Sequence, residues 1–166
     1  GTNGGTDVYV AKYSSDGDFQ WVRSHGGSHH DGAYDATTDS EGGVVVVGKY
    51  RFYMKYDGGT LPRTQSNGVE GYAVRISPNG QYTWARSAGG ATPWSQSEAV
   101  QGVAFGPDGV LHVVGYYYQN ASLGEYDVGP AQGNAAFHAT MSFDDDGDGV
   151  HEPDDLCPGS IPGTTV

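Results

Sequence analysis

Short segments of alternating hydrophobic and polar residues make up most of the chain, and glycine-containing turns separate them. Residues 7–13, 33–39, 71–77 and 99–105 alternate in the way that a half-buried strand does. Residues 44–47 and 111–114 are short apolar runs, which favour strands covered on both faces. No segment has a helical period with caps. The pattern therefore predicts an all-β fold of antiparallel strands.

Turn signals lie between these segments and indicate tight hairpins. The signals are Ser15-Asp16-Gly17, Glu41-Gly42-Gly43, Pro78-Asn79-Gly80 and Pro107-Asp108-Gly109. Residues 19–24 and 82–87 follow two of them and complete the set of predicted strands. The Gly-rich stretches 51–70 and 118–133 show no such pattern, and we expect long irregular loops there.

The pattern repeats along the chain with a period of about 65 residues. Aligning Gly17 with Gly80, an offset of 63, superimposes the first two copies of one block. A second block aligns at an offset of 67, and a third copy begins at residue 136. The matched pairs include Tyr9 with Tyr72, Lys12 with Arg75, Trp21 with Trp84, Arg23 with Arg86, Gly42 with Gly109, and Tyr72 with Phe137.

Each period corresponds to four strands, so the chain supplies two strands, then four, then three. Nine strands cannot close a ring of four-stranded units, and they leave open sheet edges. We therefore expect the chain to be part of a longer protein or to pack against other chains through those edges. The paired Trp21 and Trp84 are expected to fill the space between units, and the repeated basic residues to form salt bridges between units.

The repeat resembles the bacterial SBBP-type β-propeller repeat over roughly residues 5–143. The resemblance lies in Asp-Val-Tyr-Val-Ala-Lys from Asp7, in Asp16-Gly17, in Trp21, in Gly26-Gly27, and in the run from Asp39 to Gly48. It implies antiparallel four-stranded blades, fewer than three here, in a secreted or cell-surface protein. Gly106 replaces the acidic residue Asp39 in the second copy, and the third copy lacks the tryptophan strand.

Residues 144–158, DDDGDGVHEPDDLCP, have the spacing of a twelve-residue calcium loop. Alternate carboxylates in a tight loop converge on one centre and repel each other unless a hard cation neutralises them. The continuation through Cys157 resembles a thrombospondin type 3 repeat. That resemblance implies a Ca²⁺ site formed by Asp144, Asp146, Asp148, Val150 (through its carbonyl), Glu152 and Asp155. The alternative is a solvated acidic linker.

The single cysteine, Cys157, excludes an intrachain disulfide, and we interpret it as a candidate for an intermolecular bond. Residues 159–166 are interpreted as a tail. The formal net charge of −12 disfavours binding to nucleic acid or to anionic bilayers. No apolar run approaches the length of a membrane span. The first residues show no signal peptide; if one existed, it was removed or lies upstream.

Candidate catalytic chemistry is sparse. No nucleophile motif or phosphate-binding loop is present. His29-His30-Asp31 is either a metal cluster or a solvated loop, and His112 is expected to be packed and hydrogen-bonded. Asp31, Asp35 and Glu98 could contribute to a carboxylate pair. Two groups of aromatic residues, which are Tyr50, Phe52, Tyr53 and Tyr56, and the run Tyr116, Tyr117 and Tyr118, fit carbohydrate or protein binding or packing between blades.

These features together favour a non-enzymatic extracellular or cell-surface module for binding or assembly, with Ca²⁺ stabilising its C-terminal loop. One alternative is part of a secreted propeller enzyme that acts on polysaccharide. Another is a structural subunit of a surface filament, in which neighbouring chains cover the open strand edges. Repetition of the basic and aromatic residues indicates a structural role, because an active site is usually needed once.

Overall fold

The computed structural model describes residues 4–61, 68–89, 97–123 and 126–141, and these residues contain thirteen strands and no helix. All the paired strands are antiparallel, and no sheet closes within the described residues. The prediction of an antiparallel all-β fold is confirmed. The strands are β1 Val8–Tyr13, β2 Phe19–His25, β3 Gly32–Thr38, β4 Val44–Arg51, β5 Met54–Tyr56, β6 Gly59–Leu61, β7 Val69–Ile76, β8 Tyr82–Gly89, β9 Ala99–Phe105, β10 Leu111–Tyr118, β11 Ala121–Leu123, β12 Tyr126–Val128 and β13 Asn134–Met141.

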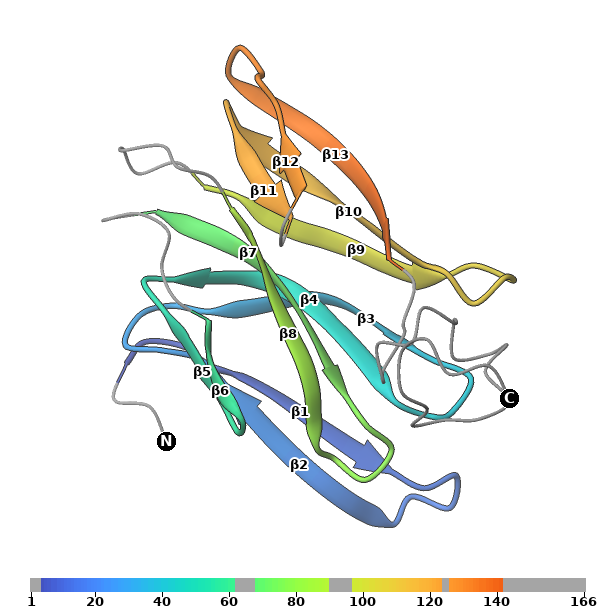
Figure 1. Ribbon diagram of the computed structural model, residues 1–166. Helices are drawn as coiled ribbons and strands as arrows, with labels where there is room; N and C mark the ends of the chain where they lie inside the picture. Colours follow the sequence, from blue (N-terminus) through green and yellow to red (C-terminus); the bar gives the residue numbers. More distant parts are fainter. Residues whose placement is uncertain (1–3, 62–67, 90–96, 124–125, 142–166) are drawn as a thin grey trace, which may run out of the picture.

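The long strands form three units that correspond to the copies of the repeat. Unit 1 is the β1–β2 hairpin, unit 2 contains β3, β4, β7 and β8, and unit 3 contains β9, β10 and β13. Neighbours along the chain within each unit are also neighbours in the sheet. Figure 1 shows the units as three stacked layers, with β1–β2 at the bottom and β9, β10 and β13 at the top. Within the described residues, the predicted strand numbers of two, four and three are confirmed for the long strands.

The expectation of irregular loops over 51–70 and 118–133 is wrong in part, because each stretch contains a short hairpin. The β5–β6 hairpin lies in the first, and β11–β12 lies in the second and extends the sheet of unit 2 beyond β8. Phe52 and Gln119, which are 67 residues apart, both adopt positive φ, 70° and 61°, at the turn that precedes the hairpin. The hairpin therefore belongs to the repeat. Three-residue strands are too short for alternation to reveal them.

The four predicted turns share one geometry. In the first, the Ser14 amide donates to the Asp18 carbonyl (2.8 Å), and the Gly17 amide donates to the Ser14 carbonyl (3.0 Å). The other three turns repeat this pair of hydrogen bonds. It is the three-residue hairpin loop in which a turn is followed by a left-handed residue, and that conformation favours glycine. The left-handed residues, with φ between 77° and 87°, are Gly17, Gly42, Gly80 and Gly109.

Two hydrophobic clusters cover the two faces of unit 2. We define face A of unit 2 as the side of Val45 and Val47, which packs on unit 3, and face B as the side of Val46 and Tyr72, which packs on unit 1 and β5–β6. The apolar run 44–47 is thus buried on both sides, as its sequence predicts. The cluster on face A contains Val45, Val47, Ala73, Ala88, Val100, Val103, Leu111 and Val113, and that on face B contains Val46, Tyr50, Met54, Leu61, Tyr72, Val74 and Ala85.

The units stack head to tail, because each contact joins face A of one unit to face B of the next. Val10 of unit 1 packs on face B of unit 2, and it is the repeat equivalent of Ala73 on face A. Phe137 of unit 3 packs on face A of unit 2, and it is the equivalent of Tyr72 on face B. Both contacts between units are therefore of the same type, A against B.

Candidate interaction surfaces

Side chains of unit 1 hold the turn between β7 and β8 in unit 2. The Trp21 indole, which is buried, donates from Nε1 to the Pro78 carbonyl (2.9 Å). Lys12 donates from Nζ to the Gly42 carbonyl (3.1 Å) and to the Pro78 carbonyl (3.3 Å), and Arg23 donates to a carbonyl of the same turn. The prediction that Trp21 fills the space between units is confirmed. Trp84, its equivalent, packs against the cluster between units 2 and 3.

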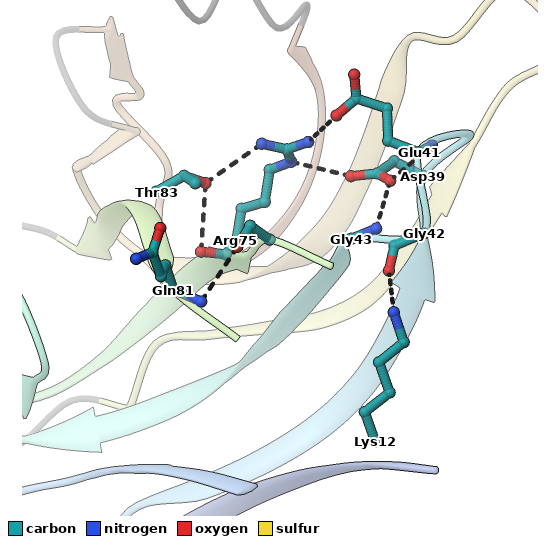
Figure 2. A network of polar contacts seen from close by, with 9 residues as sticks. Lys12, Asp39, Glu41, Gly42, Gly43, Arg75, Gln81 and Thr83 are labelled. Carbon is teal, nitrogen blue, oxygen red and sulfur yellow. Dashed lines mark hydrogen bonds and ion pairs between the residues drawn. The ribbon is translucent and has the colours of Figure 1, made fainter. Parts of the chain in front are cut away.

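Among the described residues, the ion pairs of Arg75 lie inside unit 2, whereas the sequence predicts such salt bridges between units. Arg75, which is buried, donates from Nε to Asp39 Oδ2 and from Nη2 to Glu41 Oε2, both at 2.9 Å. Asp39 also accepts from the Gly43 amide (2.7 Å). Figure 2 shows this network, with Lys12 reaching the neighbouring Gly42 carbonyl. The acidic turn thus neutralises its own sheet's arginine, whereas the equivalent Lys12 crosses to the next unit.

His25 is buried at the contact between units 1 and 2. Its ring is hydrogen-bonded through Nδ1 to the Tyr82 hydroxyl (2.9 Å) and through Nε2 to the Tyr72 hydroxyl (3.1 Å). Burial lowers the pKa of His25 from 6.5 to about 4, and the charge of Asp7 opposes that shift only in part. The ring is therefore neutral at pH 7, and it joins the two units through polar contacts that need no charge.

Acidification should destabilise the fold through His25. Because its pKa is lower in the folded than in the unfolded chain, the unfolded chain binds the proton first, and stability is lost as the pH falls from 6.5 towards 4. The loss between pH 7 and about pH 4.5 should be about 2 to 3 kcal/mol. Burial raises the pKa of Asp31, and this shift favours the folded chain as the pH falls, so it opposes the effect of His25 on stability. Denaturant unfolding of wild type and His25→Gln at both pH values measures the contribution of His25 to the free energy of unfolding. An equal pH dependence of stability in the two proteins would contradict this role of His25.

The residues of the predicted His29-His30-Asp31 cluster point to separate partners. His29 stacks on Phe52, with ring centroids 4.2 Å apart, and His30 Nδ1 lies 3.2 Å from the Thr6 amide. Asp31 is buried and accepts from the amides of Gly27 (2.5 Å) and Arg51 (2.9 Å). In the part of the chain that the structure describes, no three His, Cys, Asp or Glu side chains are placed to hold a metal ion.

The candidate catalytic carboxylates also take part in packing. Asp35 accepts from the Val103 amide (3.0 Å) and so joins β3 to β9, whereas Asp31 caps amides near the start of β3. Glu98 is buried. Asp31 and Asp35 therefore bind different segments of backbone, and they share none of these hydrogen-bond partners.

Two of the seven aromatic residues singled out in the sequence, Tyr50 and Tyr56, pack between layers. Tyr50 is fully buried, and its hydroxyl donates to Glu70 Oε2 (2.8 Å). Tyr56 packs against the face B cluster, and its ring lies 5.3 Å from that of Tyr82. Tyr117 lies against Phe137 of the same sheet. The remaining members are partly buried and are Phe52, Tyr53, Tyr116 and Tyr118.

Unit 1 exposes its own face B. Tyr9, Tyr13 and Val22 are 76%, 59% and 47% exposed, and Phe19, also exposed, contacts the Tyr13 ring edge-on at 5.9 Å. The register of β1 and β2 pairs Tyr13 with Phe19 and Ala11 with Val22, so these side chains lie on one side of the hairpin. We call this surface the open face B. The equivalents of Tyr9, Tyr13 and Val22 in unit 2 are buried, namely Tyr72, Ile76 and Ala85.

Unit 3 exposes its face A at the other end of the stack. Val114 is 45% exposed, His138 is exposed and His112 is partly so. Nδ1 of His112 lies 3.0 Å from Nε2 of His138, which confirms a hydrogen-bonded His112. We call this surface the open face A. Its equivalents in unit 2 are again buried, namely Val45, Val47 and Ala73.

The strand count predicts that such a stack has an uncovered face, but sequence reasoning did not assign residues to the two open faces, although the repeat contains the signal for them. Tyr9 and Val22 align with residues that a neighbouring unit buries, so their exposure follows once the stacking order is known. The predicted calcium ligands, from Asp144 to Asp155, and Cys157 lie outside the described residues. Among the described residues, no helix is long and apolar enough to span a membrane. No protein-family model matches the chain, and no curated protein matches it significantly.

Proposed function

We propose that this chain is a non-enzymatic binding and assembly module of a secreted or cell-surface protein, built from blade-like repeats of the β-propeller type. The observation that carries the proposal is the presence of two open faces whose equivalents inside the chain are buried contacts between units. The open face B carries the exposed apolar side chains Tyr9, Tyr13, Phe19 and Val22, and such a surface favours burial by another polypeptide. The secreted location rests on the resemblance of the repeat to the SBBP type.

The repeated residues support a structural rather than a catalytic role. Trp21 and Lys12 hold the neighbouring turn, and Arg75 neutralises the acidic turn of its own sheet. A structural subunit of a surface filament is a second candidate, and the head-to-tail order of the units favours it, because such contacts propagate. A polysaccharide-degrading enzyme has no comparable observation in its favour.

Sedimentation velocity over a hundred-fold range of concentration tests the assembly function directly. We expect the mean sedimentation coefficient to rise with concentration, because mass action favours complexes in which the open faces are buried. Sodium chloride should strengthen the association, since it screens the repulsion between chains of net charge −12. A monomer at every concentration, together with hydrolysis of a polysaccharide in an activity screen, would favour the enzyme instead.

Calcium binding by residues 144–155 is the second part of the proposal, and it rests on the sequence alone. Calorimetric titration should show a Ca²⁺ site with a dissociation constant of about 0.1 to 1 mM, the range of extracellular modules. Asp146→Ala should weaken binding at least about tenfold, because it removes one of few charged ligands. Asp16→Ala, in an exposed hairpin turn, is the matched control. Equal affinity in both variants would exclude this loop as the site.

A further inference from the structure

We propose that the occupant of each open face is a second copy of this chain, docked head to tail. The open face B of unit 1 in one copy would pack on the open face A of unit 3 in the next. This inference rests on the proposed assembly function and specifies its partner and its geometry. It assigns the contact to Tyr9, Tyr13 and Val22 on one side, and to Val114 and His138 on the other.

The same contact already occurs twice within the chain. Face A of unit 1 packs on face B of unit 2, and face A of unit 2 packs on face B of unit 3. Docking a second copy would place face A of one unit on face B of another for a third time. Tyr9 would occupy the position of Tyr72, which is fully buried, and Val114 that of Val47, which is also fully buried. The chain therefore carries both halves of a contact whose equivalents it forms twice internally.

The distribution of charge favours this contact. The chain has 20 acidic residues, yet none lies on β1, β2, β9, β10 or β13, the strands of units 1 and 3. Docking would therefore bury no carboxylate from these strands, and it avoids the large cost of desolvating a charge. The repulsion between two acidic molecules acts at longer range and is screened by salt.

The two open faces differ, so the contact is heterologous. Such a contact leaves one face free on each terminal copy, and it produces open chains or closed rings of copies. A symmetric contact, B on B or A on A, would instead stop at two copies and use one face only. This difference allows variants that disable a single face to distinguish the two geometries.

The experiment uses Tyr9→Asp to disable face B and Val114→Asp to disable face A. Both residues are exposed, so neither change should unfold the chain, and circular dichroism and the melting temperature check this. Each variant alone should remain monomeric in sedimentation velocity at concentrations where the wild type associates. An equimolar mixture should form a dimer and nothing larger, because the mixture contains one intact face A and one intact face B that can meet. Tyr34→Asp, at a tyrosine on β3 that is 46% exposed, close to the 45% of Val114, is the matched control and should associate like the wild type.

The outcomes distinguish failure of the head-to-tail contact from failure of the assembly function. Wild-type association with no dimer in the mixture, or with one variant still dimerising alone, would overturn the head-to-tail contact while leaving the assembly function standing. Association of both variants at wild-type strength would also overturn it. Absence of association in the wild type would remove the assembly function as well as this inference. A capped dimer in the mixture, with monomers in the separate samples, supports the proposed geometry.

Discussion

Gly48→Ala should destabilise the protein by about 3 kcal/mol or more, whereas Gly32→Ala should change its stability by less than about 1 kcal/mol. A Cβ on Gly48 would overlap the Gly32 carbonyl oxygen and lie 2.9 Å from the Ala33 Cα. These are backbone atoms in the paired strand, so they cannot rotate away. A Cβ on Gly32 would meet nothing within 4 Å. The crowding arises at a β-bulge, where the pairing of β3 with β4 shifts between Ala33 and Asp35.

Urea unfolding of the two variants and the wild type, at neutral pH, measures this difference. The same geometry recurs at Gly115, where a Cβ would overlap the Ala99 carbonyl oxygen beside the bulge of β9. Gly115→Ala should therefore be as destabilising as Gly48→Ala. Similar midpoints for Gly48→Ala and Gly32→Ala would show that the bulge relaxes, and they would contradict the steric argument.

Arg75→Met should cost about 3 kcal/mol, because it leaves the Asp39 carboxylate buried without its counter-ion. The side chains of Arg75 and Asp39 are 6% and 9% exposed, so water replaces the lost partner poorly. Glu41 is the second partner of Arg75, but it is well exposed. Glu41→Gln should therefore cost less than about 1 kcal/mol and is the internal control.

The two variants can be compared by urea unfolding at neutral pH, where every carboxylate of the network is ionised in the unfolded chain. Adding Asp39→Asn to Arg75→Met should recover part of the lost stability, since it removes the uncompensated charge. If Arg75→Met were no more costly than Glu41→Gln, the buried ion pair would contribute little, and the turn would be held by its amide hydrogen bonds alone. The Gly43 amide, which donates to Asp39, is the main candidate for that role.

The sequence was sufficient to predict features that depend on a few adjacent residues. The four hairpin turns follow from glycine at a left-handed position, and the doubly buried run 44–47 follows from its lack of polar residues. The repeat located the strands of all three units, because aligned copies reinforce one another. The hairpins β5–β6 and β11–β12 escaped detection, since strands of three residues have no measurable period.

Features that depend on tertiary contacts could not be predicted in the same way. The equivalence of Lys12 and Arg75 suggested a common role, yet Arg75 pairs within its sheet and Lys12 crosses to the next unit. The longer, forked guanidinium reaches both Asp39 and Glu41, whereas the lysine finds backbone carbonyls. His25 gave no signal at all, because its burial depends on Tyr72 and Tyr82 from another unit.

The use of one kind of contact between all units has a consequence for how such a gene can change. Duplicating or deleting one whole period, about 65 residues, would leave every remaining junction with its usual partners. The number of units can therefore change by whole periods without requiring a new contact surface.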